Sequence, residues 1–145
     1  MAGLTTQAQN NLLNLMKNTT WPTTGAWGAA LATTWVGLFT TAPTTDASAS
    51  FTGTEVTGGA YARVSVASTV WTAITGGSTA PSQVSNNAII TFPTPTVSWG
   101  TVLAVGIFDA STVGNLLWWN TITSQAIGIG VVASFAVGAL VLTMD

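Results

Sequence analysis

Two runs of apolar residues, joined by a short polar segment, form the strongest pattern in this chain. The runs are residues 102–108 and 116–119, and the segment between them is Asp-Ala-Ser-Thr-Val-Gly-Asn. Asp, Ser and Asn side chains mimic backbone turns, and Gly tolerates a positive φ angle. Short runs rich in Val, Ile, Leu and Trp with such a connection predict a β-hairpin.

The first run of the predicted hairpin has no polar face. In an extended strand Val102, Ala104 and Phe108 would point to one side, and Leu103 and Val105 to the other. A strand that is apolar on both faces is expected at the centre of a sandwich or at a subunit interface.

Further strands are predicted on both sides of this hairpin. Alternating or apolar segments occupy residues 34–40, 61–69 and 87–92, and residues 126–144 suggest two more strands bent near Ala133. Roughly seven short strands separated by turn residues predict an all-β fold, an antiparallel β-sandwich or partial barrel. The long loop at residues 41–59 is of a length usually associated with function or mobility.

The N-terminal part of the chain has a different pattern. Thr5 or Thr6 is suited to cap a helix that ends near residue 18, before Pro22. We therefore divide the chain into an N-terminal helix and arm (1–33) and a β-sandwich domain (34–145). The arm would pack on its own domain or reach a neighbour, and it carries five interface candidates: Leu12, Leu15, Met16, Trp21 and Trp27.

Residues 126–142 also allow a membrane interpretation. They hold no charged residue, and Gly130, Ser134 and Gly138 form a small-xxx-small ladder like those of membrane helices. Seventeen residues are at the lower limit for a span, and no Lys or Arg follows. Because apolar residues alternate with glycines here, two strands are favoured over a small membrane protein. The first residues also lack the basic and apolar regions of a secretory signal.

Charge is scarce throughout the chain. Only 4% of the residues are charged, whereas 27 are Thr. The six charged residues are Lys17, Asp46, Glu55, Arg63, Asp109 and Asp145. A polar surface that does not repel its own copies suits a protein that packs side by side in an assembly, and the alternative is the Thr-rich surface of an ordinary secreted domain.

The composition excludes several kinds of chemistry. Two cationic residues are too few for the phosphate contacts of nucleic-acid binding. The chain has no Cys and no His, which removes thiolate chemistry, the usual zinc ligands and any histidine-based triad. We expect no metal, no cofactor and no enzymatic activity.

The carboxylates suggest a structural pair more strongly than a catalytic one. Glycoside hydrolysis needs two facing carboxylates, and Glu55 with Asp109 is the one pairing to consider. Both are also natural partners for Arg63, the sole guanidinium in the chain. A bidentate bond from Arg63 to one of them would pin the long loop to the sheet, and we prefer this structural role to a binding role.

Seven tryptophans raise the question of sugar binding, because indoles stack on sugars as well as filling cores and interfaces. Trp118 and Trp119 are adjacent, so they would face opposite sides of a strand, and at least one should lie in the core or at an interface. Core or subunit contact is favoured because no cluster of polar partners accompanies them.

Three segments carry a resemblance to a known family: WVGLFTTAPT, GTEVTGGAYARVSV and NAIITFPTPTVSWGTVLAVGIFDASTVGNLLWW. With them the chain, from about residue 34 onward, resembles small bacteriophage virion structural proteins. These are often labelled tail-fibre-like, and some similar proteins act as capsid decoration or cement proteins. The most specific pieces are Glu55, Gly58-Gly59, Tyr61-Ala62-Arg63, Phe92, Trp99-Gly100, Ile107-Phe108-Asp109 and Gly114-Asn115.

The resemblance implies a β-sandwich component of the virion without catalysis. We expect a capsid decoration protein that binds the major capsid protein and copies of itself, as a homo-oligomer, with a trimer as the first expectation. A tail-fibre or receptor-binding module is the alternative, in which exposed Trp residues or loop 41–59 would contact host glycans. Nucleic acid and membrane are not expected partners.

Overall fold

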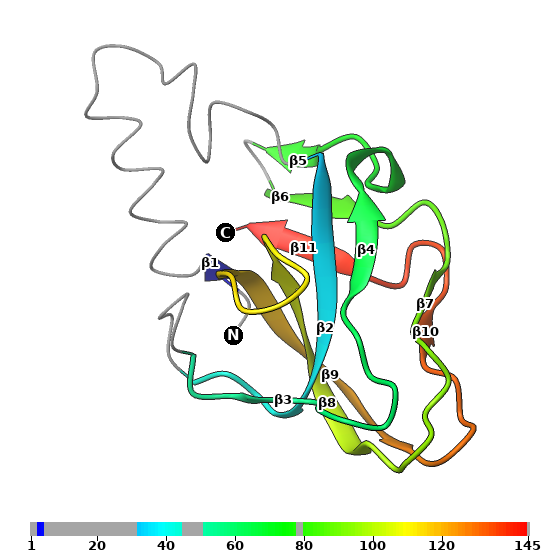
Figure 1. Cartoon of the computed structure of the whole chain (residues 1–145). Coiled ribbons are helices and arrows are strands. Elements are labelled where there is room, and N and C mark those ends of the chain that lie inside the picture. The colour runs from blue at the N-terminus through cyan, green and yellow to red at the C-terminus, as the bar shows by residue number, and fades with distance from the viewer. Residues whose placement is uncertain (1–2, 5–31, 45–50, 78–79, 145) are drawn as a thin grey trace.

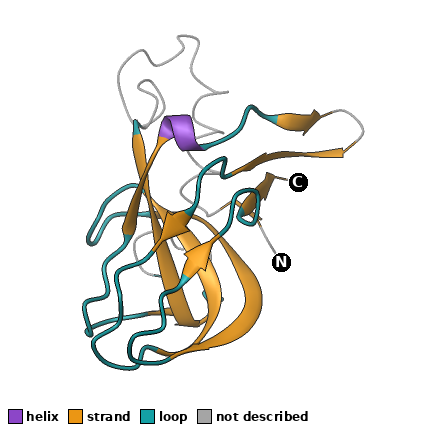
Figure 2. Ribbon diagram, turned by 90° about the vertical axis from the view of Figure 1, so that its right-hand side faces the viewer, coloured by secondary structure: helices purple, strands orange, loops and turns teal. Residues whose placement is uncertain are grey.

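The computed structural model describes residues 3–4, 32–44, 51–77 and 80–144. These residues form eleven strands and one short 3-10 helix, η1 (Ser68–Val70), and every strand pairing is antiparallel (Figures 1 and 2). The predicted all-β antiparallel fold is confirmed. The predicted helix with Leu12, Leu15 and Met16, and the segment after it with Trp21 and Trp27, lie outside the described residues.

The largest sheet is built around the predicted hairpin. Its strands are β1 (Gly3–Leu4), β9 (Leu116–Ile127), β8 (Gly100–Phe108), β2 (Thr33–Thr41) and β3 (Thr54–Glu55), in that order, and β4 (Val64–Ala67) also pairs with β2. The hairpin prediction is confirmed, although β9 extends eight residues past Trp119, to Ile127. Gly3 and Leu4, at the start of the predicted arm, pair with Trp119 and Trp118 of β9.

Two smaller sheets accompany the large one. One contains β7 (Ile90–Thr91) and β10 (Ser134–Phe135), and the other contains β5 (Thr75–Gly77), β6 (Ala80–Ser85) and β11 (Val141–Met144). A single core cluster joins Val36 and Val105 of the large sheet to Ile90 of β7, to Phe92, which follows β7, and to Leu140, which precedes β11. The smaller sheets therefore cover one face of the large sheet.

The opposite face of the large sheet is also covered. A second cluster contains Phe39, Ala104, Phe108 and Leu116, and Phe51 from the long loop packs against it. Strands β2 and β8 are thus buried on both sides, as the two apolar faces of the first run predict.

The predicted facing of two residues in β8 was wrong. Val102 belongs to the same core cluster as Val105, and Leu103 packs against the cluster that contains Ala104. Simple alternation would instead place Val102 with Ala104 and Leu103 with Val105. The register of β8 against β9 shifts between Val102 and Ala104. Such a bulge inserts extra residues in one strand, so the period of two is interrupted there.

The stretch considered as a membrane helix is not helical. Residues 126 and 127 end β9, turns follow, and β10 and β11 contain the rest of the regular structure. None of the helices in the described parts of the chain is long and apolar enough to span a bilayer. The first of the two predicted C-terminal strands is therefore the end of β9 followed by a turn at the positive-φ Gly130.

One fully buried polar side chain connects the smaller sheets. The Asn86 amide nitrogen donates to the carbonyl oxygens of Ala88 and Ala136, both at 2.8 Å. Its oxygen accepts from the Leu140 N–H at 2.9 Å. Because the Asn86 side chain and the Leu140 N–H are buried, these three bonds help to fix the path from β10 to β11.

Candidate functional site

Arg63 is the centre of the polar cluster that the sequence singled out. Its Nε donates to Glu55 Oε1 at 2.8 Å and its Nη2 donates to Glu55 Oε2 at 2.7 Å, a bidentate pair. The side chains of Arg63 and Glu55 are only 6% and 17% exposed. The guanidinium carbon also lies 3.3 Å from the centroid of the Phe108 ring, in a cation–π contact. Arg63 therefore joins β3, which lies within the predicted long loop, to the end of β8 in the central hairpin.

The remaining donors of Arg63 hold the tip of that hairpin. Nη1 donates to the carbonyl oxygens of Ala110 and Val113, at 2.9 and 2.8 Å. Val113 has a φ of 55° and is 86% exposed, which is a strained conformation for a β-branched residue. The guanidinium bonds help to hold the loop in this shape.

Asp109, the second candidate partner of Arg63, has a different contact. Its two carboxylate oxygens accept from the backbone N–H and the side-chain amide of Asn115, at 2.6 and 2.7 Å. These bonds close the loop between β8 and β9 from within. The structure thus brings Arg63 together with Glu55, and it uses Asp109 as the turn residue that the hairpin pattern requires.

Tyr61 extends the cluster into the sheet. Its hydroxyl donates to Glu55 Oε1 at 2.9 Å and accepts from the Leu38 N–H of β2 at 2.8 Å. Burial, together with the nearby Glu55 carboxylate, raises the pKa of Tyr61 far above its usual value. The phenol therefore stays protonated and serves as a neutral bridge between β2 and the ion pair.

This cluster is fully occupied by structural bonds. Both oxygens of Glu55 and both oxygens of Asp109 accept hydrogen bonds from the protein itself. In the described residues, every buried side-chain nitrogen and oxygen has a partner, and no group of three or more His, Cys, Asp or Glu side chains is placed to hold a metal ion. Its contacts are those of a brace, which holds the loop, the sheet and the hairpin tip together.

The described tryptophans mostly serve the fold. Trp118 is buried in the core and donates to the carbonyl oxygen of Thr143, while Trp119 packs against the cluster on the other face, as adjacent strand positions require. Trp99 is buried and donates to the carbonyl oxygen of Gly59. Trp71 donates to the Thr34 hydroxyl at 3.3 Å. These indoles are thus engaged within the domain.

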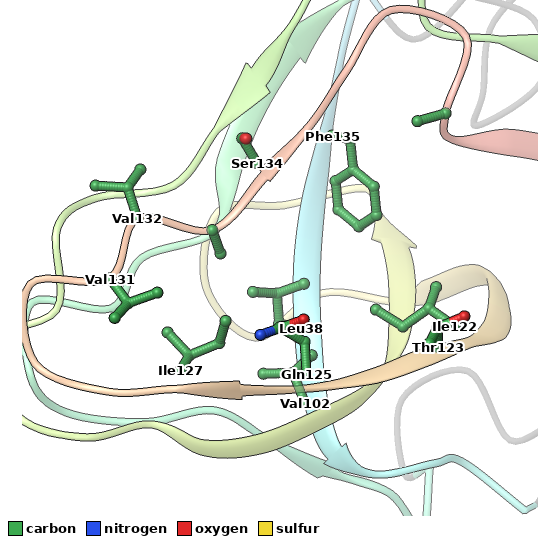
Figure 3. A pocket seen from close by; sticks show the side chains of 12 residues that line it. Leu38, Val102, Ile122, Thr123, Gln125, Ile127, Val131, Val132, Ser134 and Phe135 are labelled. Carbon is green, nitrogen blue, oxygen red and sulfur yellow. The ribbon is translucent and has the colours of Figure 1, made fainter.

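An open groove of about 540 Å³ lies between β9 and the segment that leads into β10. Figure 3 shows Ile122 and Ile127 along one wall, Val132 and Phe135 along the other, and Leu38 between them. Apart from Thr123, Gln125 and Ser134, the side chains that line it are apolar, and none is charged. The groove can therefore take apolar side chains of another protein but offers no group for acid–base chemistry.

Sequence reasoning missed this groove and the roles of Tyr61 and Asn86. The single Tyr beside Arg63 gave a weak signal, because a buried phenol commonly needs a polar partner. Asn86 lies in a polar stretch typical of a surface turn, so nothing local distinguishes it from an exposed residue.

Comparison with known proteins identifies the family of this chain. No curated protein matches the chain, but residues 3–143 match the family described as Podophage GP4 fiber I protein gp80. The matched range includes the brace, the hairpin and the groove, and it confirms the resemblance to phage virion structural proteins. The chain therefore belongs to the Podophage GP4 fiber I protein gp80 family, a family of phage virion structural proteins.

Proposed function

We propose that this protein is a non-enzymatic structural subunit of the virion that acts through contacts with other protein subunits. The observation that carries the proposal is a set of exposed apolar side chains around β7 and β10, which we call the β10 patch: Ile89, Ile129, Val131, Val132 and Val137. Ile129 and Val137 are 70% and 60% exposed. Exposed apolar side chains along neighbouring segments are available for contact with another protein.

The chemistry of the charged groups supports the non-enzymatic part of the proposal. Of the six charged residues, the three that the structure describes are Glu55, Arg63 and Asp109, and each is held by bonds within the fold. A catalytic carboxylate must reach a substrate, whereas these accept structural hydrogen bonds. The side chains that line the groove include no charged group.

Two placements in the particle fit such a subunit. Capsid decoration is supported by the Thr-rich, charge-poor chain, which suits a small protein seated between major capsid subunits that stabilises the shell by mass action. A place in a fibre is supported by the description of the matched family, which names a fibre protein.

Copy number in purified particles separates these placements. Heads and tails would be separated, and this chain quantified against the major capsid protein in each fraction. A head-associated ratio near one copy per capsid subunit supports decoration, and a few copies confined to the tail fraction support the fibre. Absence from both fractions would refute the structural role itself.

A further inference from the structure

The tip of the central hairpin, residues 110–114, carries the most exposed large apolar side chain in the described parts of the chain. Val113 is 86% exposed, and the preceding Ser111 and Thr112 are exposed as well. A single exposed valine is ordinary on a protein surface and needs no explanation by itself. The backbone conformation of Val113 and the bonds that hold it set this residue apart.

The backbone at the tip favours residues other than valine. Val113 and Gly114 have successive φ angles of 55° and 66°, both in the left-handed region. Asn-Gly is the common pair at two such positions, because Asn and Gly adopt a positive φ at low cost. A β-branched residue adopts it only where the surrounding structure compensates, and residues strained in this way cluster at functional sites. Val113 is thus an apolar side chain at a position that suits Asn.

Several contacts compensate for this strain and make the tip rigid. Arg63 Nη1 donates to the carbonyl oxygen of Val113 at 2.8 Å. Both carboxylate oxygens of Asp109 accept from Asn115 across the base of the loop. Gly114 packs closely inside the loop, where an added Cβ would lie 2.5 Å from Asp109 Oδ1. A side chain on a rigid support loses little conformational entropy on binding, so the same apolar contact gives a tighter complex.

The groups around Val113 define the surface that it fits. Residues 110–114 carry no charge, and the Arg63 and Asp109 side chains at the base of the tip are bonded within the fold. A charged group of a partner that faced the tip would lose its water without gaining an opposite charge. The matching surface is therefore a small uncharged apolar pocket, with a polar rim that can bond the hydroxyl groups of the two residues before Val113.

The pocket must belong to a surface other than the tip itself. A two-fold contact uses the same surface on both partners, and a side chain that is 86% exposed has little around it to form a pocket. The tip is also far smaller than the roughly 20–30 residues that each side of a stable interface contributes. It therefore suits one anchor within a larger contact, of the kind that a structural subunit makes with its neighbours in a particle.

We propose that Val113 inserts into a small, uncharged apolar pocket on a different protein of the same virion. The inference rests on the structural role proposed above, and it holds for either placement in the particle. The Arg63–Glu55 brace keeps the tip in the shape that this contact needs. An apolar side chain is retained at a strained position because its burial in the assembled particle helps to anchor the subunit.

Val113→Asn separates binding from folding. Because Asn suits a positive φ, the purified full-length variant should keep its circular dichroism spectrum and melt at the wild-type temperature or slightly above it. In particles from cells that make only this variant, its copy number per major capsid protein should fall by about tenfold or more, the factor in affinity that burial of a Val side chain contributes. The matched control is Ile74→Asn, at an apolar position that is 75% exposed elsewhere on the domain, and it should keep the wild-type copy number.

Photo-cross-linking in assembled particles identifies the partner. With an aliphatic photoreactive amino acid in place of Val113, irradiation should give an adduct with another virion protein. An adduct with a second copy of this chain, no adduct, or equal copy numbers for Val113→Asn and Ile74→Asn would overturn the proposal. A lower melting temperature of Val113→Asn would show that the side chain serves the fold, and would also overturn it. These outcomes leave the structural role standing, whereas absence of the wild-type chain from particles would refute that role as well.

Discussion

Replacing Arg63 with Ala is expected to destabilise the fold by about 3–5 kcal/mol. The change leaves Glu55 with a carboxylate that is only 17% exposed and no longer paired. It also removes the cation–π contact with Phe108 and the two bonds that hold the carbonyl oxygens of Ala110 and Val113. An exposed ion pair would contribute no more than about 1 kcal/mol, so the burial of this pair makes the difference.

The size of the effect can be checked by melting and by denaturant titration. For a chain of this length, each kcal/mol changes the melting temperature by about 2–4 °C, so Arg63→Ala should lower it by about 6–20 °C. Ser65→Ala, at an exposed position on the neighbouring strand, is the control and should change the free energy of unfolding by less than about 0.5 kcal/mol.

A double-mutant cycle shows whether Glu55 is the partner that matters. Because each single substitution leaves one buried charge unpaired, Arg63→Ala with Glu55→Ala should destabilise the protein by less than the sum of the two, with a coupling of about 1–3 kcal/mol. Strictly additive effects, or a loss below about 1 kcal/mol for Arg63→Ala, would refute the assignment of this pair as a buried brace.

Three further predictions concern groups around the core. Above pH 10, the free energy of unfolding should fall by up to about 1.4 kcal/mol per pH unit, because the raised pKa of Tyr61 lets the folded state keep a proton that the unfolded chain releases. Denaturant titrations at several alkaline pH values should show a weaker fall for Tyr61→Phe, and equal slopes would contradict the idea. Asn86→Ala should cost about 1–3 kcal/mol in the same assay, since it leaves the buried N–H of Leu140 without a partner. Gly37→Ala should cost about 1–3 kcal/mol, because its Cβ would lie 2.8 Å from the Phe108 ring. Gly128→Ala, where the nearest atom is 3.9 Å away, is its control, and equal losses would argue against a steric cause.

Local patterns were enough to predict the centre of the fold. The apolar runs around residues 109–115 predicted the hairpin of β8 and β9, because strand periodicity and turn chemistry act over a few residues. The apolar residues on both faces of the first run predicted that β8 would be covered on both sides.

Local patterns failed where the regular period is interrupted. Val102 and Leu103 point to the opposite faces of the sheet from those predicted, because the pairing of β8 with β9 contains a bulge. A bulge depends on how two strands pair, which the local sequence does not show. Residues 126–131 alternate like a strand, yet only the first two belong to one, because the chain turns away at Gly130.

By itself, the sequence determined that this is an all-β chain with a central hairpin and a single Arg63 that has few possible partners. Only the tertiary structure decided that Glu55 is the partner, that Asp109 closes a turn, and that Asn86 is buried. The reason is physical: turn and strand preferences are local, whereas the partner of a charge depends on pairings between segments far apart in the chain. The pairing of β3 with β2 places Glu55 beside Phe39, on the sheet that also carries Arg63's other contacts at the β8–β9 tip.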